Sequence, residues 1–143
     1  YWNRPEATAE TITRDGWLRT GDVASMDEEG YVYIQDRIKD MIISGGENVY
    51  PAEIENILIS HPGIVEVAII GQPSSKWGES PFAVVVRSDA NIDEDDILNY
   101  CEGKLARFKL PKGAAFIESI PRNANGNVLK RELREKFPGP ARE

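Results

Sequence analysis

The sequence predicts an α+β fold: a small sandwich in which helices pack on a sheet of a few strands, preceded by a β-hairpin. From residue 38 onward, apolar runs and helix-period segments alternate in the order strand, helix, two strands, helix, strand, helix. A chain of 143 residues is long enough for one domain with a proper core. Its 41% hydrophobic and 29% charged residues are ordinary for a globular protein.

The first 37 residues are predicted to form a short helix and a hairpin. Pro5 suits the first turn of a helix over residues 5–11. Residues 17–24 and 31–34 are expected to be strands, joined by an acidic turn whose Gly30 supplies a positive φ. The pattern starts again after this hairpin, so we expect a boundary between residues 1–37 and 38–143.

The next fifty residues are predicted to hold three strands and a helix. A strand over 38–43 is expected to run into a glycine-rich loop at 44–48, and Pro51 then begins a helix to residue 60 with one apolar stripe. Residues 65–71 and 82–87 are rich in β-branched side chains, with a turn at 72–75 between them. These two segments are expected to pair in one sheet.

The C-terminal third is predicted to contain two helices and one strand. Asp93 suits the N-cap of a helix to about residue 107, with Cys101 on its apolar face. A strand at 114–118 lies between loops at 108–113 and 121–127, and a basic helix at 128–137 ends before Pro138-Gly139-Pro140.

Composition excludes several kinds of function. The net charge of −7 argues against general nucleic-acid binding, although the last forty residues hold 10 basic and 4 acidic side chains and leave a local phosphate partner open. One cysteine and one histidine are too few for an intramolecular disulfide or a Cys/His zinc site. No apolar run reaches the roughly 20 residues of a membrane-spanning helix. The sequence starts without a signal peptide, so we expect a cytoplasmic protein.

Taken alone, the residues present no nucleophile–base pair, metal cluster or complete phosphate loop. Ser44-Gly45-Gly46 lacks the spacing that lets a P-loop surround phosphates. Asp22 could accept hydrogen bonds from a ribose diol or stabilise a turn, and composition does not separate these roles.

Several motifs in order carry a family resemblance. They are W-L-R-T-G-D at 17–22, Y-V-Y-I-Q-D-R-I-K-D-M-I-I-S-G-G-E-N-V-Y-P-A-E-I-E at 31–55, L-P-K at 110–112 and P-R-N-A-N-G-N-V-L-K-R-E-L at 121–133. Together they closely resemble the C-terminal part of the AMP-forming ligases, which include acyl-CoA synthetases, luciferases and peptide-synthetase adenylation domains. The resemblance implies that residues 1–37 end a large N-terminal domain, missing from this chain, and that residues 38–143 form a mobile C-terminal domain.

The resemblance also implies a reaction. A carboxylic acid, in this case a fatty or aromatic one, and ATP with Mg²⁺ give an acyl-adenylate and pyrophosphate, and the acyl group then passes to coenzyme A. The C-terminal domain rotates between the two half-reactions. The partners implied are the N-terminal domain, ATP or AMP, coenzyme A and the acid, and the fragment alone is expected to be inactive and to hold none of them tightly.

Individual roles follow from the matched positions. The resemblance assigns nucleotide binding to Asp22 and Arg37, the hinge to Lys39, and close approach to the pantetheine arm to Gly45 and Gly46. It also assigns contacts with the nucleotide end of coenzyme A to Phe108, Lys109 and Lys112. For Trp77, packing is the favoured interpretation.

One residue departs from the family pattern. Asn127 occupies the position where the family carries a lysine that reaches the carboxylate and the α-phosphate during adenylation, and an amide supplies no positive charge there. Lys130, about one helical turn further, could substitute. Two alternatives follow: a degenerate ligase, impaired in adenylation, that acts in thioester formation or interaction, and a peptide-synthetase adenylation domain with a carrier-protein acceptor.

Overall fold

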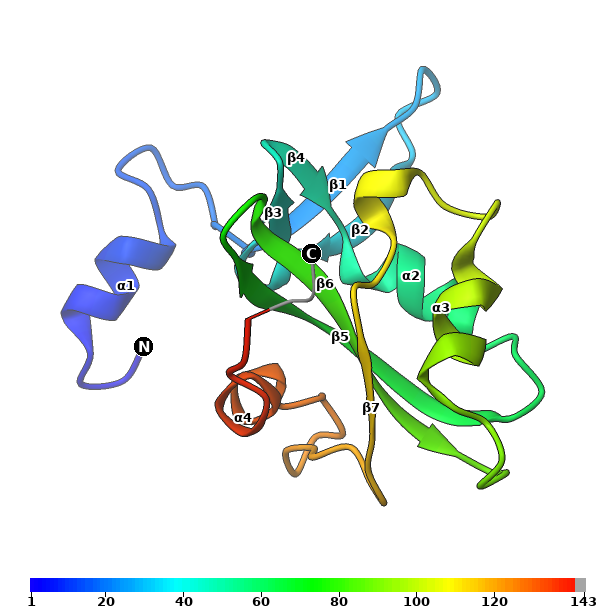
Figure 1. Cartoon of the computed structure of the whole chain (residues 1–143). Helices are drawn as coiled ribbons and strands as arrows, with labels where there is room; N and C mark the ends of the chain where they lie inside the picture. The colour runs from blue at the N-terminus through cyan, green and yellow to red at the C-terminus, as the bar shows by residue number, and fades with distance from the viewer. Residues whose placement is uncertain (141–143) are drawn as a thin grey trace. The chain divides into compact units, whose positions relative to one another are not determined.

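The computed structural model describes residues 1–140. These residues fall into two compact units, the first over Tyr1–Lys39 and the second starting at Asp40 (Figure 1). The predicted α+β class is confirmed, because each unit combines helix with a wholly or mainly antiparallel sheet.

The first unit contains a helix and a two-stranded ribbon. Helix α1 spans Pro5–Thr11, and strand β1 (Asp22–Met26) pairs antiparallel with β2 (Val32–Arg37). The Asp27 carboxylate accepts the amide protons of Glu29 and Tyr31 at 3.0 and 2.9 Å, and the Tyr31 bond lowers the Asp27 pKa. This turn closes the predicted hairpin.

The first predicted strand begins later than expected. Residues 17–21 are not part of β1, because their backbone pairs locally with the end of α1. The amide of Arg19 donates to the Thr11 carbonyl, and the amide of Thr13 donates to the Trp17 carbonyl, both at 2.8 Å. A local turn therefore replaces five residues of expected strand.

The second unit is built on a five-stranded sheet. Strands β3 (Ile42–Ser44), β4 (Glu47–Val49), β5 (Ile64–Ser74) and β6 (Gly78–Arg87) lie in the order β4-β3-β6-β5, and β7 (Ala114–Phe116) pairs parallel with β6. Only the β6–β7 pairing is parallel: β3–β4 and β5–β6 are antiparallel hairpins, and β3 meets β6 antiparallel where Ser44 lies opposite Gly78.

Helices cover both faces of this sheet (Figure 1). Helices α2 (Pro51–Leu58) and α3 (Glu94–Cys101) share one core with Ile69 and Val85, whereas α4 (Lys130–Lys136) inserts Leu133 into a second core with Ile70 and Val84. Successive strand residues point to opposite faces, so the apolar runs of β5 and β6 serve both cores.

Three strand predictions need correction. The expected strand at 38–43 begins only at Ile42, because Ile38–Asp40 forms a turn of 3₁₀ helix. The expected loop at 44–48 is a tight hairpin that includes β4. The expected turn at 72–75 continues β5 through Pro73, which the structure tolerates because β5 is an edge strand.

The helices are shorter than predicted. Helix α3 begins with the expected cap, in which the Asp93 carboxylate accepts the Asp96 amide at 3.0 Å, but it ends at Cys101. Gly103 then reverses the chain at φ +73°, and residues 107–109 form a 3₁₀ turn. Similarly, β7 ends at residue 116 and α4 begins only at residue 130.

Candidate functional site

A groove in the first unit gathers three of the predicted site residues. It encloses about 660 Å³ and is lined by residues 18–22 and 37–39. Asp22 and Arg37 are cross-strand partners of β1 and β2, and Arg37 Nε lies 3.0 Å from Asp22 Oδ1. An exposed pair of this kind adds at most about 1 kcal/mol to stability. Its importance lies in presenting a carboxylate and a guanidinium side by side to one groove.

Lys39 also lines this groove and is the last residue of the first unit. Its side chain is exposed and makes no hydrogen bond or ion pair with the described residues. No contact of the Lys39 side chain with the described residues therefore restricts the backbone conformation at this position.

The two predicted glycines form the turn between β3 and β4. Ser44 pairs with Glu47, so Gly45 and Gly46 are the two central residues of the hairpin, at φ +62° and +86°. Positive φ at both positions is what a type I′ turn requires. A Cβ on Gly46 would meet nothing within 4 Å. A ligand can therefore come close to the backbone here.

The neighbouring β5–β6 hairpin supports this glycine turn. The Gly45 amide donates to the Trp77 carbonyl at 2.8 Å, and a Cβ on Gly45 would lie 2.9 Å from the Trp77 ring. The Ile43 amide donates to Glu79 Oε2 at 3.1 Å, where the β3–β6 pairing has ended. The Trp77 ring thus lies against the Gly45 backbone on one side, whereas 38% of its surface is exposed and lines a second groove.

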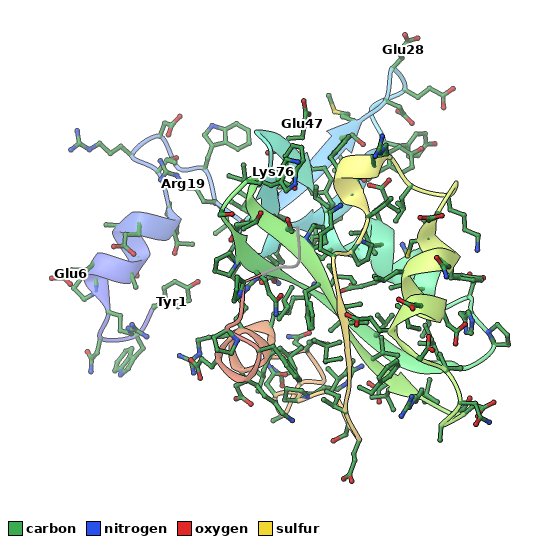
Figure 2. The ribbon with its side chains drawn as sticks, in the orientation of Figure 1. Tyr1, Glu6, Arg19, Glu28, Glu47 and Lys76 are labelled. Carbon is green, nitrogen blue, oxygen red and sulfur yellow. The ribbon has the colours of Figure 1, made fainter. Side chains whose placement is uncertain are left out.

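A second groove lies beside the glycine turn. It encloses about 460 Å³, and its lining combines two aromatic rings, three cationic side chains and one serine: Trp77, Phe108, Lys76, Arg107, Lys112 and Ser44. In Figure 2, Lys76 and Glu47 lie at the same end of this unit. Flat rings between cations suit a ligand that carries an aromatic base and phosphate groups.

The structure separates the predicted residues Lys109 and Lys112. Lys112 borders the groove with Phe108, whereas Lys109 points elsewhere and its Nζ lies 2.8 and 2.7 Å from the two carboxylate oxygens of Glu53. Sequence reasoning missed Lys76 and Arg107. Each of them directly precedes an aromatic residue, and this is the one feature of the sequence that could have indicated them. The feature is not specific, because many surface cations precede an aromatic residue.

Asn127 lies in an ordered, exposed loop. The Asn123 side-chain oxygen accepts the amides of Asn125 and Asn127 at 3.0 and 2.9 Å. The Arg122 guanidinium donates to the Gly126 carbonyl at 2.9 Å and pairs with Glu66 at 2.7 Å. The loop is therefore fixed to β5 and presents Asn127 to solvent.

Lys130 is not free to take the place of the family lysine. Its Nζ lies 2.8 Å from Glu55 Oε1, and only 11% of its side chain is exposed. The same carboxylate oxygen accepts the Ile69 amide at 2.8 Å. Lys130 thus connects α4 to α2 and to the sheet.

Within residues 1–140, these sites are accompanied by neither a reactive thiol nor a cluster of metal-binding side chains. Burial raises the pKa of Cys101 to about 11, as expected of a core residue. The described residues contain no group of three His, Cys, Asp or Glu side chains able to hold a metal ion. Among residues 1–140, no helix has both the length and the apolar character needed to cross a membrane.

Two curated CoA ligases are similar to nearly the whole of this chain. The chain is 57% identical over 137 residues to the long-chain-fatty-acid–CoA ligase FadD13 of Mycobacterium tuberculosis, covering 96% of this chain and 27% of that protein. It is 53% identical over 135 residues to a 2-succinylbenzoate–CoA ligase of Bacillus cereus, covering 94% and 28%. The chain thus spans about a quarter of the length of these relatives.

Solved structures show the same relationship. ATP-bound MatB from Rhodopseudomonas palustris matches with a TM-score of 0.87 and 48% identity, over 96% of this chain and 27% of that one. The o-succinylbenzoate CoA synthetase MenE from Bacillus subtilis, in complex with its acyl-adenylate intermediate, matches with a TM-score of 0.87 and 40% identity, over 94% and 27%. The family model of the AMP-binding enzyme C-terminal domain matches residues 53–127. The chain therefore belongs to the AMP-binding enzyme C-terminal domain family, as its motifs indicated.

Proposed function

We propose that this chain is the C-terminal part of an AMP-forming acid–CoA ligase that acts on a fatty or aromatic acid. The observation that carries the proposal is the 57% identity, over nearly the whole chain, to a ligase named for long-chain fatty acids. The 2-succinylbenzoate–CoA ligase supports the aromatic alternative for the acid. The ligase would use ATP and coenzyme A whichever acid it takes, and we expect it to act in the cytoplasm.

In the first half-reaction, the acid carboxylate attacks the α-phosphate of ATP, the bond between the α- and β-phosphates breaks, and pyrophosphate leaves. Mg²⁺, supplied with the nucleotide substrate, would neutralise charge on its phosphates. Asp22 is suited to accept hydrogen bonds from the ribose hydroxyls, and Arg37 to donate to ribose or phosphate oxygens. Their 3.0 Å contact holds both groups at one groove. Asn127 would approach the reacting groups with an amide, which donates hydrogen bonds but adds no charge.

In the second half-reaction, the thiol of coenzyme A attacks the acyl carbonyl and AMP leaves. The groove beside the glycine turn is proposed to bind the nucleotide end of coenzyme A, with Phe108 against the adenine and Lys76, Arg107 and Lys112 near the phosphates. The open backbone of Gly46 would let the pantetheine arm pass closely.

The change between half-reactions is assigned to Lys39. We take residues 1–37 as the end of the large N-terminal domain and residues 38–143 as the mobile domain. The division of the chain into its two compact units falls two residues later, between Lys39 and Asp40. An exposed residue without side-chain partners can absorb a large φ/ψ change at low cost.

The comparisons support neither a peptide-synthetase adenylation domain nor a degenerate ligase. The relatives named above are CoA ligases rather than peptide synthetases, and the comparisons give no support to a degenerate protein without adenylation. We therefore interpret Asn127 as an unusual residue at the lysine position of a ligase that still forms the adenylate.

The test uses the full-length protein with Mg²⁺-ATP, coenzyme A and a panel of fatty and aromatic acids. We expect acid-dependent release of AMP and pyrophosphate together with acyl-CoA. Lys112→Met should raise the KM for coenzyme A by about tenfold, the effect of one lost charge-assisted hydrogen bond, and leave adenylate formation unchanged. Lys104→Met is the matched control, because Lys104 lies over the Tyr100 ring and does not line the groove.

Two results would contradict the proposal. Formation of acyl-adenylate that passes only to a carrier protein would assign the chain to the peptide synthetases. Equal KM values for coenzyme A in the Lys112 and Lys104 variants would remove the groove from the coenzyme A site.

A further inference from the structure

Two ion pairs bracket Lys39 in the chain. On one side, Arg37 is paired with Asp22 at 3.0 Å, and the Ile38 amide donates to the Gly21 carbonyl at 2.9 Å. On the other side, Asp40 Oδ1 lies 3.1 Å from Arg134 on α4. Between these contacts, the Lys39 side chain has no partner among residues 1–140.

Burial of the chain also changes at this point. Residues 37–39 are exposed, whereas the side chain of Asp40 is only 16% exposed, and Ile42 two residues later is completely buried. The second unit thus begins abruptly at Asp40. Its first side-chain contact with a distant part of the sequence is the pair with Arg134, 94 residues away.

Arg134 is itself held in a fixed position. The preceding residue, Leu133, is completely buried between α4 and the sheet. Earlier in the helix, Lys130 pairs with Glu55 at 2.8 Å. Arg131, in contrast, is 85% exposed and pairs only with Glu135 of the same helix, at 3.7 Å.

We infer that Arg134 is a positioning residue that fixes Asp40 to α4, so that rotation between half-reactions is confined to Lys39. This inference rests on the proposed hinge at Lys39. Without the Arg134 contact, the flexible segment would extend through residues 40 and 41 to the start of β3. A longer flexible segment permits more orientations, so a smaller fraction of molecules would hold the productive one.

The test compares Arg134→Met with Arg131→Met in the full-length protein. Both substitutions remove one α4 charge and keep an unbranched side chain, but only the first breaks the contact with Asp40. We expect hydrogen exchange in a peptide spanning residues 38–43 to accelerate about fivefold in Arg134→Met and to stay unchanged in Arg131→Met. We also expect kcat for acyl-CoA formation to fall about threefold or more in Arg134→Met, at an unchanged KM for the acid.

A charge reversal distinguishes positioning from general loss of stability. Asp40→Arg and Arg134→Asp should each accelerate exchange in residues 38–43, and the double variant should restore the slow rate, because the pair is re-formed with opposite signs. Equal exchange in the Arg134 and Arg131 variants, or no restoration in the double variant, would overturn the inference.

The inference and the proposed function can fail separately. If the wild-type protein makes no acyl-CoA even from a ready-made acyl-adenylate, the second half-reaction is wrong, and the hinge role on which Arg134 depends has no reaction to serve. The exchange measurement needs no activity, so it still decides whether Arg134 fixes Asp40.

Discussion

Replacing Gly45 with alanine tests how the glycine turn is held. An L-residue in the left-handed region costs about 1–2 kcal/mol, and this cost applies equally to Gly45 and Gly46. Only at Gly45 would the new Cβ also meet the Trp77 ring, at 2.9 Å. Forcing such a contact typically costs a further 1–3 kcal/mol, and Trp77, with 38% of its surface exposed, can tilt enough to keep the loss near the low end.

We therefore expect Gly45→Ala to lower the free energy of unfolding by about 2–3 kcal/mol, and Gly46→Ala by about 1–2 kcal/mol. Urea unfolding followed by far-UV circular dichroism measures both values without relying on tryptophan emission. Total tryptophan emission gives an independent readout, since Trp2 and Trp17 are already exposed in the wild type and only the Trp77 ring should become more exposed, in the Gly45 variant alone. Equal losses in the two variants, with unchanged emission, would refute the idea that the ring fixes this turn.

Three further predictions concern single side chains. Asn127→Lys should raise acid-dependent pyrophosphate release by tenfold or more, since it adds a positive charge at the usual lysine position; an unchanged rate would show that this charge is not needed. Because burial raises the Cys101 pKa to about 11, the folded state keeps a proton that the unfolded state loses near pH 9. Stability should therefore fall between about pH 9 and 11, and Cys101→Ala, compared by thermal unfolding, should remove this dependence. Ser80 buries a hydroxyl without a hydrogen-bond partner among the described residues, so Ser80→Ala should keep the unfolding free energy or raise it by up to about 1 kcal/mol; a loss above 1 kcal/mol in urea unfolding would reveal an unseen partner.

Local patterns were enough to predict most of the fold. The apolar stripe around Ile54 and the start at Pro51 predicted α2, and the β-branched runs predicted β5 and β6. These features depend on periodicity and on proline geometry, which act over a few residues. Element ends were less predictable, because hairpin pairing with β6 extended β5 through residues 72–74 and a local turn shortened β1.

Some residues of the candidate site could likewise be predicted from the sequence, and others could not. The motifs placed Asp22, Arg37, Gly45 and Gly46 in the sequence, and short-range backbone geometry brings each pair together. Sequence alone, by contrast, did not separate Lys109 from Lys112, since the two side chains have the same chemistry and lie three residues apart. Only the fold assigns the first to Glu53 and the second to the groove.

The sequence by itself determined the fold class, the family and the position of the glycine turn, because these follow from residue order and local conformational preference. Tertiary structure alone decided which cations surround Phe108, which carboxylate occupies Lys130, and that Arg134 fixes Asp40. The physical reason is that an ion pair depends on where two side chains meet in space. That meeting point is set by packing of the whole sheet and its helices, between residues that lie 75 to 94 positions apart in the last two pairs.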